Sequence, residues 1–293
     1  MTRIEEFGWR GAVAPGIGRI VSAHGDYYHL VCNEQDHGEI LARKKKSAFG
    51  RMKSVAPDSM KGRKISEIRA TEPIKPITGD FVRFRYNPQG DSMILETLPR
   101  FSHFERKDPT ARRTSQTLAV NFDTLFIMMS MNENFSLRRL ERYLALAEDI
   151  GEANVVLVLT KKDLSTVDRL AGCSVDRLSD RYDLDICEIS AVTGEGLDRI
   201  SEYIAPGRTV AFIGSSGVGK STLLNTLAGE EWAATQEIQE WSGKGRHTTT
   251  SRELVMLPSG AMVIDTPGIR EIGMLGEVDD VLVKGESSHR YRR

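Results

Sequence analysis

One eight-residue segment constrains the fold of this chain more than any other. Residues 214–221 read Gly-Ser-Ser-Gly-Val-Gly-Lys-Ser and match the pattern GxxxxGK[ST]. An apolar stretch at 210–213 precedes them, and a helical stretch beginning at Thr222 follows. This strand–loop–helix context is what the pattern requires. The glycines let backbone N–H groups wrap around phosphates without a Cβ clash, so the segment predicts a phosphate-binding loop.

Two side chains of this loop carry specific chemistry. Lys220 is expected to place its ammonium on the β- and γ-phosphates of a nucleotide, and the Ser221 hydroxyl to coordinate Mg²⁺. The residues expected to contact the nucleotide here are Gly214, Ser215, Ser216, Gly217, Val218, Gly219, Lys220, Ser221 and Thr222.

A second element lies about 44 residues further on. The apolar run Met-Val-Ile at 262–264 ends in Asp265 and leads through Thr-Pro to Gly268. Alone this is an ordinary strand-to-turn sequence. Paired with the phosphate loop it predicts a Walker-B strand, in which Asp265 holds the Mg²⁺ shell through water and Gly268 contacts the nucleotide.

A third element predicts which base is bound. Thr160-Lys161-Lys162-Asp163 closes an apolar run and resembles the guanine motif NKxD, with threonine in place of asparagine. The Asp163 carboxylate can accept hydrogens from guanine N1 and N2, a pair that adenine does not offer. Thr160 has lost an amide donor, so we expect a weaker contact with the neighbouring loop. Ser190-Ala191, about 30 residues later, resembles the loop whose backbone contacts the guanine oxygen. Taken alone, each short motif is equally compatible with solvated surface residues.

The pattern of apolar runs predicts two domains of different class. From residue 124 onward, continuous apolar strands (124–130, 154–160, 210–214 and 262–265) alternate with helices, one of them capped by Ser136. This predicts an α/β domain with a mostly parallel sheet and helices on both faces. Before residue 100, short alternating strands (17–22, 27–32, 39–43, 81–86 and 93–98) predict an all-β oligonucleotide-binding (OB) barrel. Residues 101–117 are expected to form a linker.

Charge differs between the two ends of the chain. Residues 1–108 carry 19 lysines and arginines against 14 acids, whereas the remainder carries 21 against 27. The stretch from Arg43 to Lys64 contains nine cations and one acid, Asp58, and its glycines and proline predict a long loop. That loop is either a solvated surface loop or a phosphate-contacting loop on a nucleic-acid-binding barrel.

Other features exclude several classes. Three cysteines, none in CxxC spacing, provide neither a disulfide framework nor a four-cysteine zinc site. No apolar run approaches the ~18 residues of a membrane span, and acids near the N-terminus argue against a signal peptide. We therefore expect a cytoplasmic protein without a membrane partner.

Taken together, the motifs resemble those of the GTPase superfamily in permuted order, because the guanine motifs precede the phosphate motifs. The closest resemblance is to the ribosome small-subunit-dependent GTPase A (RsgA) family of circularly permuted GTPases. It is carried by the barrel, Asn121-Phe-Asp123, Leu137-Arg-Arg-Leu-Glu-Arg-Tyr143-Leu, the phosphate loop, Gly245-Arg-His-Thr-Thr-Thr250 and Asp265-Thr-Pro-Gly-Ile-Arg270. It implies a GTP hydrolase that acts in late maturation of the small (30S) ribosomal subunit, binds its rRNA and is stimulated by it.

The resemblance also implies roles in the first switch. One threonine among Thr248, Thr249 and Thr250 would reach Mg²⁺ and the γ-phosphate. Ras-like enzymes place a water-orienting glutamine where this chain has Ile269, which cannot hydrogen-bond water. By resemblance, His247 takes that role when the ribosome orders the switch, so hydrolysis by the free protein should be slow.

Three domains follow from these expectations: an OB-like RNA-binding barrel (1–105), a circularly permuted GTPase domain (106–275) and a short C-terminal tail (276–293). Family members usually continue into a Cys/His zinc domain, for which this chain has no ligand set, so no zinc site is expected. GTP or GDP with Mg²⁺ are the expected ligands, and the family suggests a monomer.

Three alternatives remain open at this point. The first is a GTP- and RNA-binding module with negligible hydrolysis. The second is a P-loop ATPase or nucleotide kinase, against which the guanine motif argues. The third is a permuted GTPase acting on the large subunit, against which the barrel argues.

Overall fold

The fold is described from a computed structural model, which defines residues 1–34, 38–44, 74–107, 115–132, 135–165, 174–229 and 253–265. The chain divides into two compact units, Met1–Arg100 and Phe101–Arg293. Among the described helices, none is long and apolar enough to cross a membrane.

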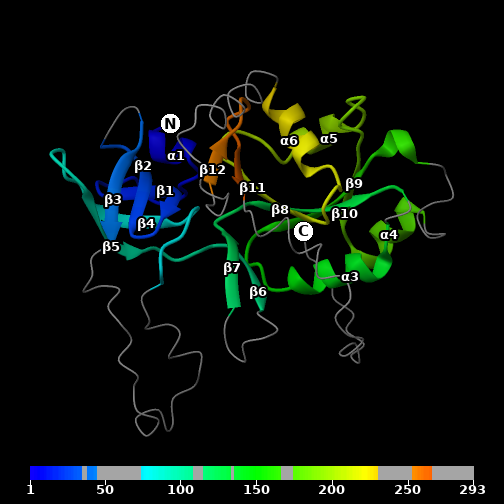
Figure 1. Ribbon diagram of the computed structural model, residues 1–293, viewed down its shortest axis with the longest axis horizontal. Coiled ribbons are helices and arrows are strands. Elements are labelled where there is room, and N and C mark those ends of the chain that lie inside the picture. The colour runs from blue at the N-terminus through cyan, green and yellow to red at the C-terminus, as the bar shows by residue number, and fades with distance from the viewer. Residues whose placement is uncertain are drawn as a thin grey trace, which may run out of the picture. The chain divides into compact units, whose positions relative to one another are not determined.

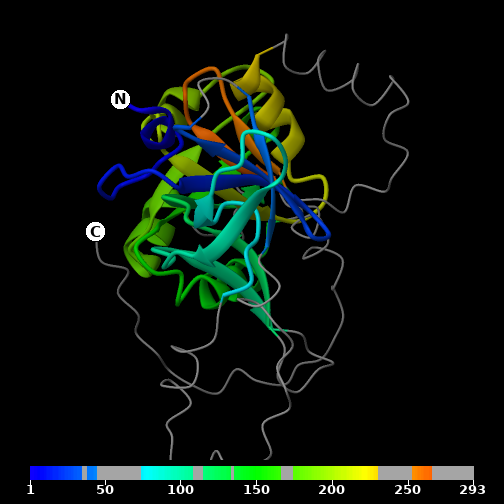
Figure 2. The same ribbon diagram turned by 90° about the vertical axis from the view of Figure 1, so that its left-hand side faces the viewer.

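The first unit is a closed barrel of five strands (Figures 1 and 2). After the short helix α1 (Arg3–Glu6) come β1 (Ile17–His24), β2 (Tyr27–Cys32), β3 (Ile40–Lys44), β4 (Phe81–Arg85) and β5 (Ser92–Thr97). The strand order is β1-β2-β3-β5-β4, and β4 pairs back onto β1. Every pairing is antiparallel except β3 with β5.

Alternate side chains along each strand point inward and fill the interior of the barrel. Buried residues from all five strands form one apolar cluster: Ile20, Tyr28, Leu30, Cys32, Ile40, Ala42, Val82, Phe84 and Ile94. All five predicted strands are present, with ends that differ by up to two residues. One part of the predicted basic loop is wrong, because Arg43 and Lys44 belong to β3. Residues 45–64 lie outside the described part of the chain.

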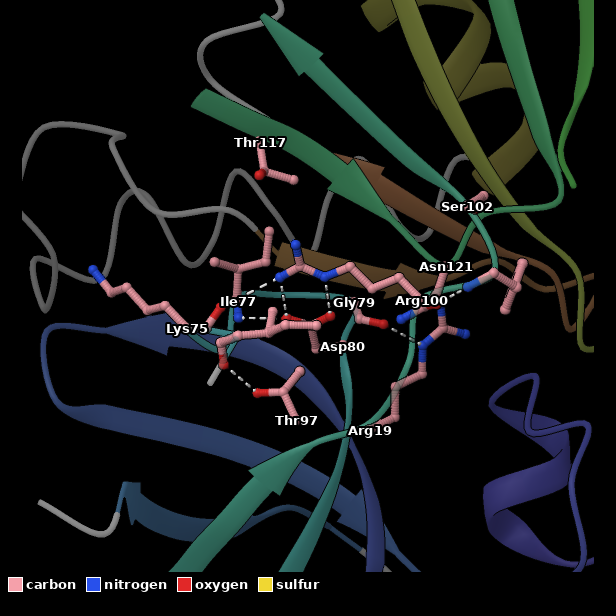
Figure 3. Close-up of polar contacts among 12 residues, drawn as sticks. Arg19, Lys75, Ile77, Gly79, Asp80, Thr97, Arg100, Ser102, Thr117 and Asn121 are labelled. Carbon is pink, nitrogen blue, oxygen red and sulfur yellow. Dashed lines mark hydrogen bonds and ion pairs between the residues drawn. The ribbon is translucent and has the colours of Figure 1, made fainter. Parts of the chain in front are cut away.

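A buried ion pair joins Asp80, the residue before β4, to Arg100, beyond β5 (Figure 3). The Asp80 carboxylate has no exposed surface and accepts hydrogen bonds from Arg100 Nε at 2.7 Å and Arg100 Nη2 at 2.8 Å. It also accepts one from the backbone N–H of Ile77. Arg19 is buried beside it, with its guanidinium over the Phe81 ring and donating to the carbonyl oxygen of Phe7. Burial raises the pKa of Asp80, and the arginines oppose that rise.

The second unit begins with a hairpin, β6 (His103–Lys107) and β7 (Ser115–Val120). The expectation of a linker over 101–117 is therefore wrong. Polar residues dominate residues 101–117, so the sequence shows no clear alternation of apolar and polar residues. The two strands nevertheless pair with each other. Ser102 is buried, and its hydroxyl bonds both the N–H and the carbonyl of Phe122, so the hairpin is fixed to the start of the next strand.

A six-stranded sheet forms the centre of this unit (Figure 1). Its strands are β8 (Thr124–Ser130), β9 (Asn154–Thr160), β10 (Asp185–Glu188), β11 (Thr209–Gly214), β12 (Glu253–Met256) and β13 (Met262–Asp265). The order is β10-β9-β8-β11-β13-β12. The first five are parallel, and β12 is antiparallel to β13.

Helices connect these strands: α3 (Leu137–Leu146), the short 3-10 helix η2 (Lys162–Leu164), α4 (Val175–Tyr182), α5 (Leu197–Ser201) and α6 (Lys220–Ala228). As predicted, Ser136 caps α3 by accepting from the N–H of Arg139. The strands β8 and β11 are buried along their whole length, which explains why their sequences are apolar at every position.

Candidate nucleotide-binding site

The predicted motif residues that the structure describes lie at the carboxyl ends of neighbouring parallel strands. The phosphate loop follows β11, the Thr160–Asp163 segment follows β9, and Ser190 lies two residues beyond β10. The sheet also reverses its chain order between β8 and β11, since β9 continues from β8 on one side and β13 pairs with β11 on the other. Open α/β sheets bind ligands outside the carboxyl ends of strands at such a point.

The first turn of the phosphate loop depends on close backbone approach. A Cβ at Gly214 would lie 2.8 Å from the carbonyl oxygen of Met128 on the neighbouring strand β8. Gly217 and Gly219 have φ angles of +70° and +104°, which L-residues rarely adopt. Glycine is therefore required at Gly214 by contact and at the other two by conformation.

The loop ends at the N-terminus of α6, whose first turn is accessible. Gly219 precedes the helix and, because it has no side chain, provides no side-chain cap for the first N–H groups. The Lys220 ammonium donates to the carbonyl oxygens of Gly214 at 2.8 Å and Ser215 at 3.3 Å, so it lies folded over the loop. Ser221 and Thr222 are exposed. A helix N-terminus with a lysine beside it has the chemistry of a candidate anion-binding site.

The candidate base-binding carboxylate is held by Ser190. The Ser190 hydroxyl donates to Asp163 Oδ1 at 2.6 Å and accepts from the N–H of Thr193 at 3.2 Å. Ser190 is buried, whereas Asp163 is exposed. The Thr193 N–H therefore helps to orient the Ser190 hydroxyl, and that hydroxyl holds the Asp163 carboxylate.

The loop from Ser190 to Gly196 folds back on β10. Its Ser190 N–H donates to the carbonyl of Glu195 at 2.9 Å. A Cβ at Gly196 would lie 2.1 Å from the carbonyl oxygen of Glu188, and its φ is +75°. The sequence motifs did not include Gly196, although a glycine in a short loop after a strand is a signal for such an approach.

A second contact joins the two base-binding segments. Lys162 Nζ lies 2.8 Å from Glu195 Oε1, and the Lys162 N–H donates to the carbonyl of Ile189. The hydrogen bond to Glu195 raises the pKa of Lys162. Lys161, between Thr160 and Lys162, has a left-handed backbone with φ of +60°.

Two hydroxyl groups connect the base-binding segments with the phosphate-binding segment. Thr160 is buried, and its hydroxyl lies 2.6 Å from the carbonyl oxygen of Val218 and 3.4 Å from that of Met129. A hydroxyl has one proton, so the shorter bond to Val218 is the effective one. The Thr226 hydroxyl on α6 lies 2.9 Å from the carbonyl oxygen of Thr222 and 3.2 Å from that of Ala191. By the same rule its bond within the helix is the stronger one, and its link to Ala191 is the weaker. Sequence reasoning missed Thr226.

Several predicted residues lie outside the described part of the chain. These are His247, Thr248, Thr249, Thr250 and Gly268. The backbone of Asp265 pairs with Glu253 as the last residue of β13, which places it at the same edge of the sheet as the phosphate loop. The site described here therefore comprises the base-binding and phosphate-binding segments.

Comparison with known sequences decides the family. The sequence model of the RsgA GTPase family matches residues 97–275. The chain belongs to the RsgA GTPase family. A relative from Lactiplantibacillus plantarum, named small ribosomal subunit biogenesis GTPase RsgA 2, is 40% identical over 256 residues, which are 87% of this chain and 66% of the relative. A relative from Methanosarcina acetivorans, named small ribosomal subunit biogenesis GTPase RsgA, is 43% identical over 215 residues, which are 73% and 57% of the two chains.

Two solved structures show a similar fold. The crystal structure of YjeQ from Thermotoga maritima matches with a TM-score of 0.58 at 25% identity, covering 90% of this chain and 77% of that one. YloQ, whose title describes a circularly permuted GTPase, matches with a TM-score of 0.54 at 21% identity, covering 86% and 70%. The chain spans 66% and 65% of the first two curated relatives.

Proposed function

We propose that this chain binds and hydrolyses GTP as a maturation factor of the small ribosomal subunit. The observation that carries the proposal is the arrangement of a guanine-type carboxylate and a phosphate loop at the carboxyl ends of one parallel sheet. They are joined by the 2.6 Å bond between Thr160 and Val218. One nucleotide can therefore contact both. The curated relatives, named as small ribosomal subunit biogenesis GTPases, support the choice of partner.

The proposed contacts follow from the donors and acceptors available. Asp163 accepts from guanine N1 and N2, and the Ala191 N–H donates to the guanine oxygen. The N–H groups from Gly217 to Ser221 surround the phosphates. Lys220 exchanges its two carbonyl acceptors for phosphate oxygens, which are stronger partners because they are charged.

The donor set also fits Mg²⁺. The Ser221 hydroxyl is exposed at the first turn of α6, and Asp265 ends the adjacent strand β13. Within the described ranges, no three His, Cys, Asp or Glu residues are grouped as a metal site. Mg²⁺ commonly uses few protein ligands beside phosphate and water oxygens. When bound, it would neutralise charge that develops between the β- and γ-phosphates.

The finer domain assignment belongs to the same proposal. The barrel, taken as OB-like over 1–105, binds rRNA with the help of the basic stretch, and 106–275 form a circularly permuted GTPase domain whose sheet is covered by helices on both faces. His247 orients the attacking water, one of Thr248, Thr249 and Thr250 reaches Mg²⁺ and the γ-phosphate, and Gly268 contacts the nucleotide. Support for these assignments comes from the family.

Hydrolysis measured with purified ribosomal subunits tests this function. We expect slow release of phosphate by the chain alone, a large increase with small subunits and none with large subunits. The Arg181→Gln variant, which changes an exposed residue of α4, serves as a control and should be stimulated as the parent chain is. Equal stimulation by both subunits, or none by either while GTP binds, would contradict the proposal.

A further inference from the structure

Four exposed side chains form a continuous row across the outer surface of the barrel. Strand register pairs Tyr27 with Arg43, Arg43 with Met93, and Met93 with Arg85, across β2, β3, β5 and β4. Directly paired residues on neighbouring strands point to the same face of a sheet. We name Tyr27, Arg43, Met93 and Arg85 the surface row.

The chemistry of the surface row is unusual for a solvated face. Tyr27 and Met93 remain 39% and 41% exposed, and the residues next to them in sequence, Tyr28 and Ile94, are buried in the barrel core. An aromatic ring and a thioether next to arginines form a surface that binds flat, polarisable groups. Burial of the core does not require them, because the row points away from it.

Arg43 is held in a fixed orientation. Its guanidinium carbon lies 4.3 Å from the centre of the Tyr27 ring, and its Nε lies 2.5 Å from Asp91 Oδ2. The stack and the ion pair together fix the guanidinium plane before any partner arrives. Asp91 also balances the charge of Arg43, so this arginine is better suited to stacking than to neutralising a phosphate.

The position of the row along the chain indicates the partner. The basic stretch of nine cations and one acid begins at Arg43 itself and continues directly beyond β3. Cations that track a nucleic-acid backbone and planar side chains that stack on its bases are the two components of single-strand binding. A duplex does not offer its bases in this way, because they are already stacked and paired.

We infer that the surface row is a stacking platform for unpaired RNA bases, separate in chemistry from the phosphate contacts of the basic stretch. The inference rests on the proposed RNA-binding role of the barrel. It adds that the surface row contacts the bases, whereas the basic stretch contacts the phosphates. Bases stack on the Tyr27–Arg43 pair and against Met93. Because the charge of Arg43 is already balanced, the platform adds affinity that salt screens little.

Binding of the full chain to three RNA probes tests this inference. The probes are a labelled single-stranded oligouridylate, the same backbone without bases, and a blunt RNA duplex of equal length. Tyr27→Ala should weaken binding of the oligouridylate about tenfold. It should leave the other two affinities and the salt dependence unchanged. Tyr27→Phe keeps the ring and should retain the affinity.

A matched control comes from the second unit. Arg181 stacks over Tyr182 at 5.0 Å and bonds Glu141, so Tyr182→Ala removes a ring from a similar arginine–tyrosine–carboxylate group outside the barrel. It should not change RNA binding. Thermal unfolding of each variant shows that the fold is retained, as expected for an exposed ring.

Each other outcome overturns the inference. The first is that the parent chain does not bind oligouridylate. The second is that Tyr27→Ala weakens binding of the probes with and without bases equally. The third is that Tyr27→Ala leaves oligouridylate affinity unchanged but weakens binding to small subunits, which would assign the row to a protein partner. Hydrolysis by the chain alone is measured in parallel. If GTP turnover and its stimulation fail in the parent chain, the proposed function fails whatever the oligonucleotide result.

Discussion

The Thr160 hydroxyl donates a 2.6 Å hydrogen bond to the carbonyl oxygen of Val218. That carbonyl belongs to the same peptide group as the N–H of Gly219, one of the donors proposed to face the phosphates. A bond to the oxygen of a rigid peptide group also fixes the direction of its N–H. A residue of the base-binding motif therefore sets the geometry of the phosphate loop, 58 residues further along the chain.

Thr160→Val tests this relationship, because valine keeps the shape and removes the hydroxyl. A buried carbonyl left without its donor costs about 1–3 kcal/mol, which we expect as a loss of stability in denaturant unfolding. GDP and GTP affinities should fall together, by about fivefold to tenfold, since the loop binds the phosphates common to both. Thr160→Ser keeps the hydroxyl and should restore both properties. Normal affinity in the valine variant would contradict the coupling.

Asp163→Asn should exchange the preferred base. Asparagine offers one donor and one acceptor, which match xanthine N1–H and its additional carbonyl, whereas guanine would face an amide donor with its own amino group. Competition binding should show the preference for guanine over xanthine nucleotides falling by about a hundredfold or more. Ser190→Ala removes only the bond that orients Asp163, so it should weaken guanine binding by about fivefold and leave the preference intact. A reversed preference in the serine variant would exclude this division of roles.

Two glycines of one loop allow a matched pair of substitutions. Gly194 and Gly196 both have positive φ, at +81° and +75°. A Cβ at Gly194 meets nothing within 4 Å, whereas one at Gly196 lies 2.1 Å from the Glu188 carbonyl oxygen. Gly194→Ala should therefore cost only the left-handed conformation, about 1–2 kcal/mol. Gly196→Ala adds a backbone clash and should cost about 2–5 kcal/mol in total.

The two glycine variants should also differ in nucleotide affinity. Displacement of Gly196 moves Glu195, whose carbonyl holds the Ser190 N–H, so Gly196→Ala should weaken guanine binding more than Gly194→Ala. Urea unfolding and GDP titration of both variants measure the two effects. Equal losses for the two variants would show that conformation alone limits the loop.

The thiol of Cys187 gives a pH-dependent prediction. Burial raises its pKa to about 11, from a usual value of 9.0. The folded protein thus binds this proton more tightly than the unfolded chain does. The contribution to stability is complete below about pH 9 and is lost as the pH rises toward about 11.

Cys187→Ala isolates this contribution. The difference in unfolding free energy between the parent chain and the variant should shrink between pH 9 and pH 11, measured in denaturant. The parent thiol should also react slowly with iodoacetamide at pH 8, because only the thiolate is nucleophilic. A difference that stays constant over this range would show that the thiol titrates normally.

The sequence predicted those parts of the molecule that local patterns determine. The strands β8 and β11 are apolar and buried at every position, and β9 is buried from Val156 to Thr160. Ser136 caps α3 by accepting from the N–H of Arg139. The hairpin β6–β7 was not predicted, because residues 101–117 are mostly polar and Leu118, Ala119 and Val120 lie beyond that segment. The predicted strand 39–43 and the predicted basic loop overlapped at Arg43, and Lys44 was placed in the loop because charge was weighed above alternation.

The sequence identified the two main motifs of the candidate site, but not the contacts that connect them. The phosphate loop and the guanine-type motif follow from composition and spacing. The contacts of Thr160 with Val218 and of Ser190 with Asp163 depend on which strands are neighbours, which no local pattern encodes. Gly196 required knowledge of the backbone that approaches it.

The strand order has a consequence for the growing polypeptide. Strand β8 lies between β9 and β11, and its own chain provides β9 soon after it but β11 only some 80 residues later. During synthesis, β8, β9 and β10 can assemble while one edge of β8, apolar at every position, has no partner. A nascent chain with such an edge is exposed to aggregation until residues 209–214 leave the exit tunnel and fill the gap. In this topology, the strand that precedes the phosphate loop is also the one that covers the open edge of β8.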